Sequence, residues 1–156
     1  MASQTVRFAP VVVALALAGC GQVGSSRTPT LDQLPLVDGT AIVVQARQCD
    51  RGANPFCAIE AVIVNKRYRS SGAFVASEHG HLRKLGWTSM AGDNGDERAA
   101  ESPGHELRLT YATGGNDLLG WDLGWIKRPT PIVVALDRQV LRGTPSMSIM
   151  IEAGPT

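Results

Sequence analysis

The sequence lacks several features that would assign a chain to a class directly. Its longest apolar run, residues 8–19, would rise only about 18 Å as a helix, which is too short for a bilayer core. Aromatic residues make up only 5% of the chain. The formal net charge is +1 and falls to zero if residues 1–19, which contain Arg7, are removed. Charge therefore gives no reason to expect a nucleic-acid partner.

Motifs that carry catalysis or bind metal are equally scarce. The sequence contains no G-x-S-x-G elbow and no P-loop. His79 and His81 lie near Glu78, but residues two apart on a helix point to different sides. These three residues are therefore expected to be solvated polar residues on a helix. The acidic run 93–97 lacks the spacing of an EF-hand and is typical of an exposed loop. We therefore name no catalytic residue, no metal site and no cofactor.

The N-terminus, in contrast, carries a clear pattern. Residues 1–7 are polar with one positive charge, residues 8–19 are apolar, and the run ends in Leu17-Ala18-Gly19-Cys20. This order is typical of an export signal. Residues 1–19 are therefore predicted to be a signal peptide.

The tetrapeptide at residues 17–20 resembles the lipobox of bacterial lipoproteins. The resemblance implies cleavage before Cys20 and attachment of lipid to its thiol, with fatty acyl chains such as palmitate. Two acyl chains hold a protein stably, because each buried CH₂ contributes about 0.8 kcal/mol. Residues 20–40 are rich in Gly, Ser, Thr and Pro and predict a flexible tether, and the apolar pairs around Pro35 are expected to begin docking on the domain. An ordinary secretory signal with a chance cysteine is the alternative.

Cys49 and Cys57 are the two remaining cysteines. An exported chain enters an oxidising compartment, where an even pair is best interpreted as a disulfide. The residues between them favour a turn. The alternative, a redox or metal pair, is disfavoured because the spacing is C-x7-C and no histidine lies nearby.

The remaining pattern predicts a single α+β domain over residues 41–156. Strands are expected over 41–48, 59–65, 87–91, 107–113 and 146–152, and helices after Ser70-Ser71 and after Thr130-Pro131. Residues 92–105 are expected to form a loop, with a short solvated helix at 98–101. From residue 59 the order is βαββαβ, that of a ferredoxin-like sandwich with two helices on one face of an antiparallel sheet. Residues 41–48 would add an extra strand.

Three tryptophans stand out among the few aromatic residues. Trp87 follows a predicted helix stop and is expected in the core. Trp121 and Trp125 lie four apart in a long Gly- and Leu-rich connection, where exposed rings would form a binding surface and buried rings would cover the sheet. The domain is also similar to uncharacterised lipoproteins of high-GC Gram-positive bacteria. The Cys49/Cys57 pair carries this resemblance together with the segments 85–87, 102–103, 107–113 and 122–126. This resemblance implies no activity.

These features favour a lipid-anchored protein on the extracytoplasmic face of the cell membrane, with a non-enzymatic binding or interaction domain. Its partners would be the membrane, through the anchor, and an envelope protein or small ligand, with no nucleic acid. A small envelope enzyme, such as a metal-assisted hydrolase, and a structural envelope component are the alternatives. A pocket where His, Asp or Glu side chains converge would favour the enzyme.

Overall fold

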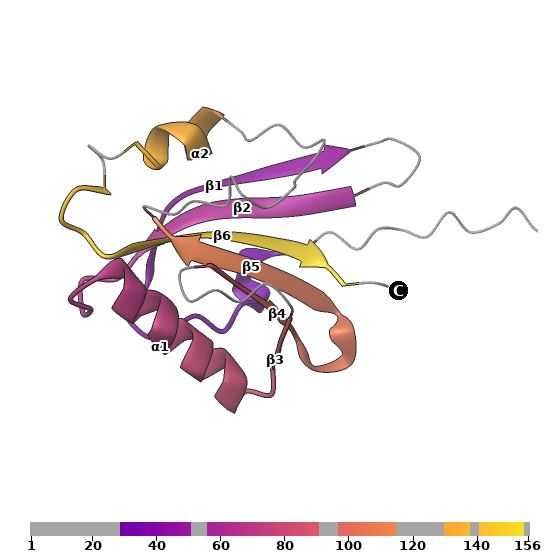
Figure 1. The fold of residues 1–156 in the computed structure, drawn as a ribbon. Helices are drawn as coiled ribbons and strands as arrows, with labels where there is room; N and C mark the ends of the chain where they lie inside the picture. Colours follow the sequence, from indigo (N-terminus) through magenta and orange to yellow (C-terminus); the bar gives the residue numbers. More distant parts are fainter. Residues whose placement is uncertain (1–28, 51–55, 91–96, 115–129, 138–140, 155–156) are drawn as a thin grey trace, which may run out of the picture.

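The chain folds into an α+β domain built on one antiparallel sheet (Figure 1). The computed structural model describes residues 29–50, 56–90, 97–114, 130–137 and 141–154. The elements run β1 (Ala41–Asp50), β2 (Phe56–Val64), α1 (Ser71–Lys84), β3 (Thr88–Ser89), β4 (Glu97–Glu101), β5 (Leu107–Thr113), α2 (Thr130–Ala135) and β6 (Ser146–Ala153), with 3-10 turns η1 (Leu31–Gln33) and η2 (Pro103–His105). No described helix is long and apolar enough to cross a membrane.

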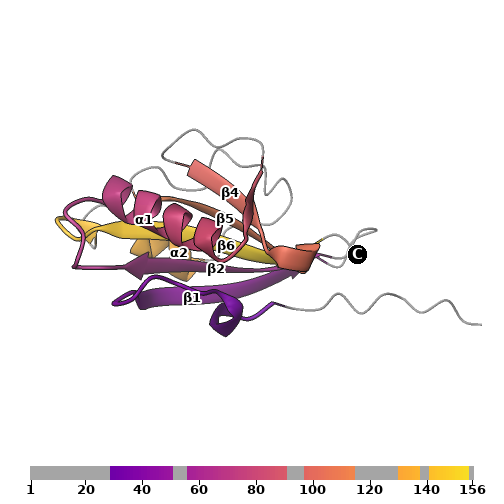
Figure 2. The ribbon, with the colours of Figure 1, turned by 90° about the horizontal axis from the view of Figure 1, so that it is seen from below.

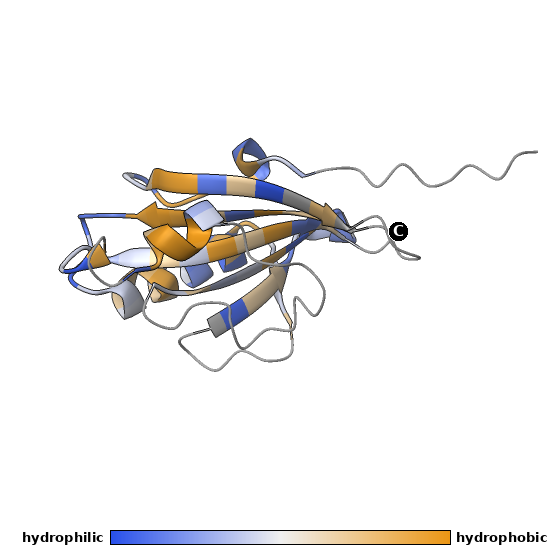
Figure 3. Cartoon of the chain, turned by 90° about the horizontal axis from the view of Figure 1, so that it is seen from above, coloured by the Kyte–Doolittle hydropathy of each residue, from blue (hydrophilic) through white to orange (hydrophobic). Residues whose placement is uncertain are grey.

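The six strands pair in the order β1-β2-β6-β5-β4-β3, and the two helices lie on opposite faces of the sheet. Figure 2 views the α1 side and Figure 3 the α2 side, where the strongly apolar α2 lies over β1 and β2. The helices lie on opposite faces because β2 is apolar on both of its faces. Ile59 and Ile63 pack in the cluster that contains α1, whereas Val62 packs with Ile132 of α2. A strand buried on both faces needs cover on both.

This arrangement corrects the prediction of two helices on one face, and the ferredoxin-like topology is not confirmed. In that topology β2 and β5 would be neighbours, but β6 lies between them and is antiparallel to both. The helix α2 is also short, since six residues rise only about 9 Å. It therefore does not span the sheet as a crossover helix would.

The prediction of a loop with a short helix over residues 92–105 is also partly wrong. Residues 97–101 form β4, which pairs with β5 on one side and with β3 on the other. Ala99 and Ala100 are both buried, one on each face of the strand. Alanine favours helices, but sheet pairing and burial override that weak preference here.

The segment before β1 belongs to the folded domain rather than to a tether. Leu31, Leu34 and Val37 are buried in the same cluster as α1 and β2. The side-chain amide of Asn65 donates to the Asp38 carbonyl oxygen at 3.0 Å and so holds the end of this segment beside the exit of β2. The predicted boundary at residue 41 is therefore too late, and the domain begins by residue 29. The expected docking of the apolar pairs around Pro35 is confirmed.

The predicted disulfide between Cys49 and Cys57 is confirmed. The two residues face each other across β1 and β2, with Cα atoms 4.1 Å apart. The bond closes the hairpin at the end of the sheet where β6 finishes, because Ala58 pairs with Glu152. Trp87, expected in the core, is 5% exposed and packs in the α1 cluster.

Candidate functional site

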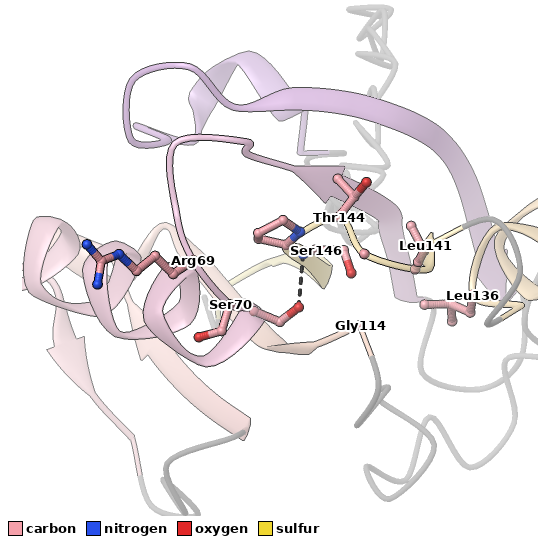
Figure 4. Close-up of a pocket in the computed structure, with 10 residues that line it drawn as sticks. Arg69, Ser70, Gly114, Leu136, Leu141, Thr144 and Ser146 are labelled. Carbon is pink, nitrogen blue, oxygen red and sulfur yellow. Dashed lines mark hydrogen bonds between the residues drawn. The ribbon is translucent and has the colours of Figure 1, made fainter.

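A pocket of about 400 Å³ opens where α1 begins, β5 ends and β6 starts (Figure 4). Its described lining comes from the turn into α1, the residue after β5, the region following α2 and the approach to β6: Arg69, Ser70, Ser71, Gly114, Leu136, Leu141, Gly143, Thr144, Pro145 and Ser146. This volume lies at the small end of the range found for ligand sites.

The start of α1 forms one wall of the pocket, and its capping is visible in the sequence. Ser70 is the N-cap, and its side-chain oxygen accepts a hydrogen bond from the Ala73 N–H at 3.1 Å. The next side chain has a different role. The Ser71 hydroxyl oxygen accepts from the Ser146 N–H at 3.0 Å and so ties the helix start to the first residue of β6. The predicted Ser70-Ser71 cap thus also joins the helix to the sheet.

Gly114 and Ser146 form the floor of the pocket. The Gly114 N–H donates to the Ser146 carbonyl oxygen at 3.0 Å, which extends the pairing of β5 and β6 by one step. A Cβ added at Gly114 would overlap the Ser146 hydroxyl and would lie 3.2 Å from Cδ1 of Leu141. Only glycine leaves room for this close approach.

Some polar groups of the pocket lining make no hydrogen bond to a described residue. Ser146 is only 3% exposed, and its hydroxyl makes no hydrogen bond to a described residue. Figure 4 shows its oxygen between the start of α1 and Leu141. Arg69 is exposed and forms no ion pair or hydrogen bond within the described ranges. The N–H group of Ser71 has no acceptor inside the helix, because it belongs to the first turn.

The described lining contains no aspartate or glutamate, and Arg69 is its one charged residue. Figure 4 shows the Arg69 side chain extending away from Ser146 and the two leucines. Leu136 and Leu141 form an apolar wall opposite the helix start. The arrangement suits binding of a small molecule through hydrogen bonds and apolar contact. Sequence reasoning missed this site, because its residues come from four separate segments, and the Ser70-Ser71 cap was the only local signal.

Glu78, noted in the sequence beside two histidines, is not a solvated helix residue as expected. Its side chain is 0% exposed and lies under the segment before β1. One carboxyl oxygen, Oε2, accepts from the Val37 N–H at 3.1 Å, while Oε1 has no hydrogen-bond partner. Burial raises the pKa of Glu78, and this effect outweighs the opposing effects of the Val37 hydrogen bond and the charge of His81.

The histidines of α1 do not assemble a metal site with Glu78. The Nδ1 atom of His79 lies 3.0 Å from the Tyr111 hydroxyl, with which it hydrogen-bonds. Within the part of the chain that the structure describes, no three His, Cys, Asp or Glu side chains are grouped so as to hold an ion.

A second charged group, which sequence reasoning missed, lies at the opposite end of the sheet from the pocket. The Arg108 guanidinium bridges Glu101 at 3.0 Å and Glu152 at 3.5 Å. The Nδ1 atom of His105 lies 2.7 Å from the other oxygen of Glu101. Hydrogen bonds from His105 and Arg108 lower the pKa of Glu101, whereas burial raises that of Glu152. The pairing of β5 with β4 and β6 places Arg108 beside both glutamates and accounts for this group. None of its residues lines a described pocket.

The other residues singled out from the sequence lie outside the described residues. These are the lipidation residue Cys20, the two tryptophans Trp121 and Trp125, and the acidic run up to residue 96. Searches of protein-family models, curated proteins and solved structures find no match to this chain.

Proposed function

We propose that this protein is an exported lipoprotein, held to the membrane through lipid on Cys20, whose domain binds a small ligand in the pocket at the start of α1. The anchor rests on the order of charged, apolar and lipobox residues before Cys20. The Cys49–Cys57 disulfide is in keeping with export, because such bonds persist in oxidising compartments. The ligand-binding role rests on one observation, the pocket of about 400 Å³ with its polar and apolar walls.

The positions of Pro29 and of the pocket in the domain support the combination of a lipid anchor with a ligand-binding pocket. Pro29 lies beside Leu107 and Ala153, at the start of β5 and the end of β6. Eight residues separate Cys20 from Pro29, and nine Cα–Cα steps reach at most about 32 Å. The pocket lies at the other end of these strands, since Gly114 follows β5 and Ser146 begins β6. A seven-residue strand spans roughly 24 Å, so Pro29 and the pocket lie at opposite ends of these strands.

Cell fractionation tests the anchor. The variant Cys20→Ala should move the protein from the membrane fraction to the soluble fraction and should abolish labelling by an alkyne analogue of palmitate. The matched control is Cys49→Ser, which also removes one sulfur but leaves the anchor residue intact, and it should remain in the membrane fraction. If Cys20→Ala stays membrane-bound with its labelling unchanged, the proposed anchor is wrong.

A further inference from the structure

We propose that a cluster of exposed cations at one end of the domain binds a linear polyanion of the cell envelope, a chain that carries repeated phosphate or carboxylate groups. The cluster, which we name the basic end, consists of Lys66, Arg67, Arg69 and Arg142. This role goes beyond the small-ligand role of the pocket. The affinity for a polyanion does not depend on the proposed anchor, whereas the direction in which the basic end faces does.

The basic end is formed by two neighbouring turns of the chain. Residues 65–70 join β2 to α1, and residues 141–145 lead into β6. The Asn65 N–H donates to the Pro145 carbonyl oxygen at 3.1 Å, so the two turns lie side by side. All four cationic residues are exposed, and Figure 4 shows the Arg69 side chain extending away from the pocket.

Hydrogen bonds and ring packing fix the first of these turns. Asn65 is only 1% exposed, its side-chain oxygen accepts from the Arg67 N–H at 3.1 Å, and its amide donates to the Asp38 carbonyl oxygen at 3.0 Å. Tyr68 stacks on Phe74, with ring centroids 5.2 Å apart. Because Asn65 and Tyr68 pack inward, the three cations of this turn are left on the outside. A partner therefore meets a turn that is already ordered.

The positive charges of the basic end are not neutralised by ion pairs. Among the described residues, no acidic side chain forms an ion pair with any of the four cations. The Arg67 guanidinium donates to the Asp38 carbonyl oxygen at 3.4 Å, which is a neutral acceptor. Asp38 contacts the first turn and Asp137 precedes the second, so the basic end keeps a net charge of +2 when both are counted.

The spread of these charges favours a polymer over a small anion. Three of the cations lie on the first turn and Arg142 lies on the second, so no single anionic group meets all four. One exposed ion pair adds little to affinity. A chain of repeated anionic groups contacts several cations at once, and each contact releases a counterion into the solution.

The anchor directs the basic end away from the membrane. Pro29 lies beside Leu107 and Ala153, whereas the basic end adjoins the opposite ends of β5 and β6. Eight residues separate Cys20 from Pro29, and a Gly- and Ser-rich linker of nine steps has a root-mean-square length of about 17 Å. This length is shorter than the roughly 24 Å of a seven-residue strand. The basic end therefore faces polymers of the envelope rather than the lipid headgroups around the anchor.

The test measures the anisotropy of dye-labelled long-chain polyphosphate mixed with the full-length protein in a neutral detergent. With four contacts, the logarithm of the association constant should fall with the logarithm of salt concentration at a slope of about −2.8. The affinity should therefore fall about 50-fold between about 0.05 M and about 0.2 M sodium chloride. Polyglutamate should compete with polyphosphate, and neutral dextran should not.

Two double variants locate the binding surface. Lys66→Gln combined with Arg142→Gln removes two of the four contacts, so the salt slope should fall to about −1.4 and the affinity at about 0.15 M salt by about tenfold. The control combines Arg83→Gln with Lys84→Gln. It removes the same two charges at the last turn of α1, more than a Debye length away, and should leave the affinity within about twofold. Equal weakening by both double variants would mean non-specific attraction and would overturn the inference.

The direction of the basic end is tested with protein held through its anchor on vesicles. Polyphosphate affinity on phosphatidylglycerol vesicles should stay within about twofold of that on phosphatidylcholine vesicles, because the membrane charge is screened beyond about 8 Å. A tenfold loss on phosphatidylglycerol would show that the basic end binds lipid headgroups and would overturn the inference. So would the lack of polyphosphate binding at the lowest salt concentration, which would leave the pocket and the anchor untouched. Polyphosphate binding by a protein that vesicles do not retain would refute the anchor and uphold the basic end.

Discussion

Glu78 allows the packing of the segment before β1 to be tested by pH. Its carboxyl group is 0% exposed, and only one of its oxygens has a hydrogen-bond partner, the Val37 N–H. Burial raises the pKa of Glu78 above its ordinary 4.5, so folding favours the protonated form. The contribution of this group to stability is therefore greatest below pH 4.5 and is lost as the pH rises towards the folded-state pKa.

The variant Glu78→Gln removes this ionisation while keeping an oxygen that can accept from Val37. The free energy of unfolding of the variant, relative to the unmodified protein, should rise with pH above about 4.5, with a slope of up to about 1.4 kcal/mol per pH unit. The rise should stop once the folded-state pKa is passed. An unpaired buried polar atom costs about 1–3 kcal/mol, and the new amide nitrogen retains that cost, so the two proteins should differ least at low pH.

Urea denaturation of both proteins at pH 4, 5, 6, 7 and 8 measures this difference. The control Glu106→Gln makes the same charge change on an exposed side chain, and its stability should stay within about 0.5 kcal/mol of the unmodified protein. A difference between Glu78→Gln and the unmodified protein that does not vary with pH would refute the assigned role of burial. So would a variant that becomes less stable, relative to the unmodified protein, as the pH rises.

Three further changes test other parts of the fold. Glu101→Gln should lower the free energy of unfolding at neutral pH, as measured by urea denaturation. Because the pKa of Glu101 is lowered in the fold, its carboxylate stabilises the fold only while it is charged, and the loss should shrink as the pH falls below about 4.5. A loss that grows on acidification would contradict this. Cys49→Ser should lower the free energy of unfolding by about 2.5 kcal/mol, from the loop of eight residues that the disulfide closes. A thermal shift within error of zero would show that the bond adds nothing. Phe74→Ala, in the core beneath Tyr68, should cost about 3–5 kcal/mol by the same denaturation assay, and a cost below 1 kcal/mol would mean that the site is poorly packed.

Local signals in the sequence predicted most of the elements but not their arrangement. The strands at 41–48 and 107–113 and the Ser70 cap were recognisable because alternation and capping depend only on near neighbours. Strand order depends on which strands meet, and nothing local distinguishes β6 beside β5 from β2 beside β5. The burial of β2 on both faces was visible in its continuous apolar run, and it already implied cover on both faces.

The pocket escaped prediction for a related reason. Ser146 and Gly114 look ordinary in sequence, and their roles follow from the β5–β6 pairing that brings them together. Ser146 becomes notable only once its burial beside the pocket is known. Glu78 was likewise assigned to a solvated helix face, because the segment that covers it lies 41 residues earlier in the chain.

The mass of the N-terminal tryptic peptide of the protein isolated from its native membranes tests the anchor most directly. The account predicts a peptide of residues 20–27 that begins at Cys20 and carries a diacylglyceryl group. A peptide of residues 8–27 with an unmodified thiol at Cys20 would show that no cleavage or lipidation occurs, and it would contradict the account.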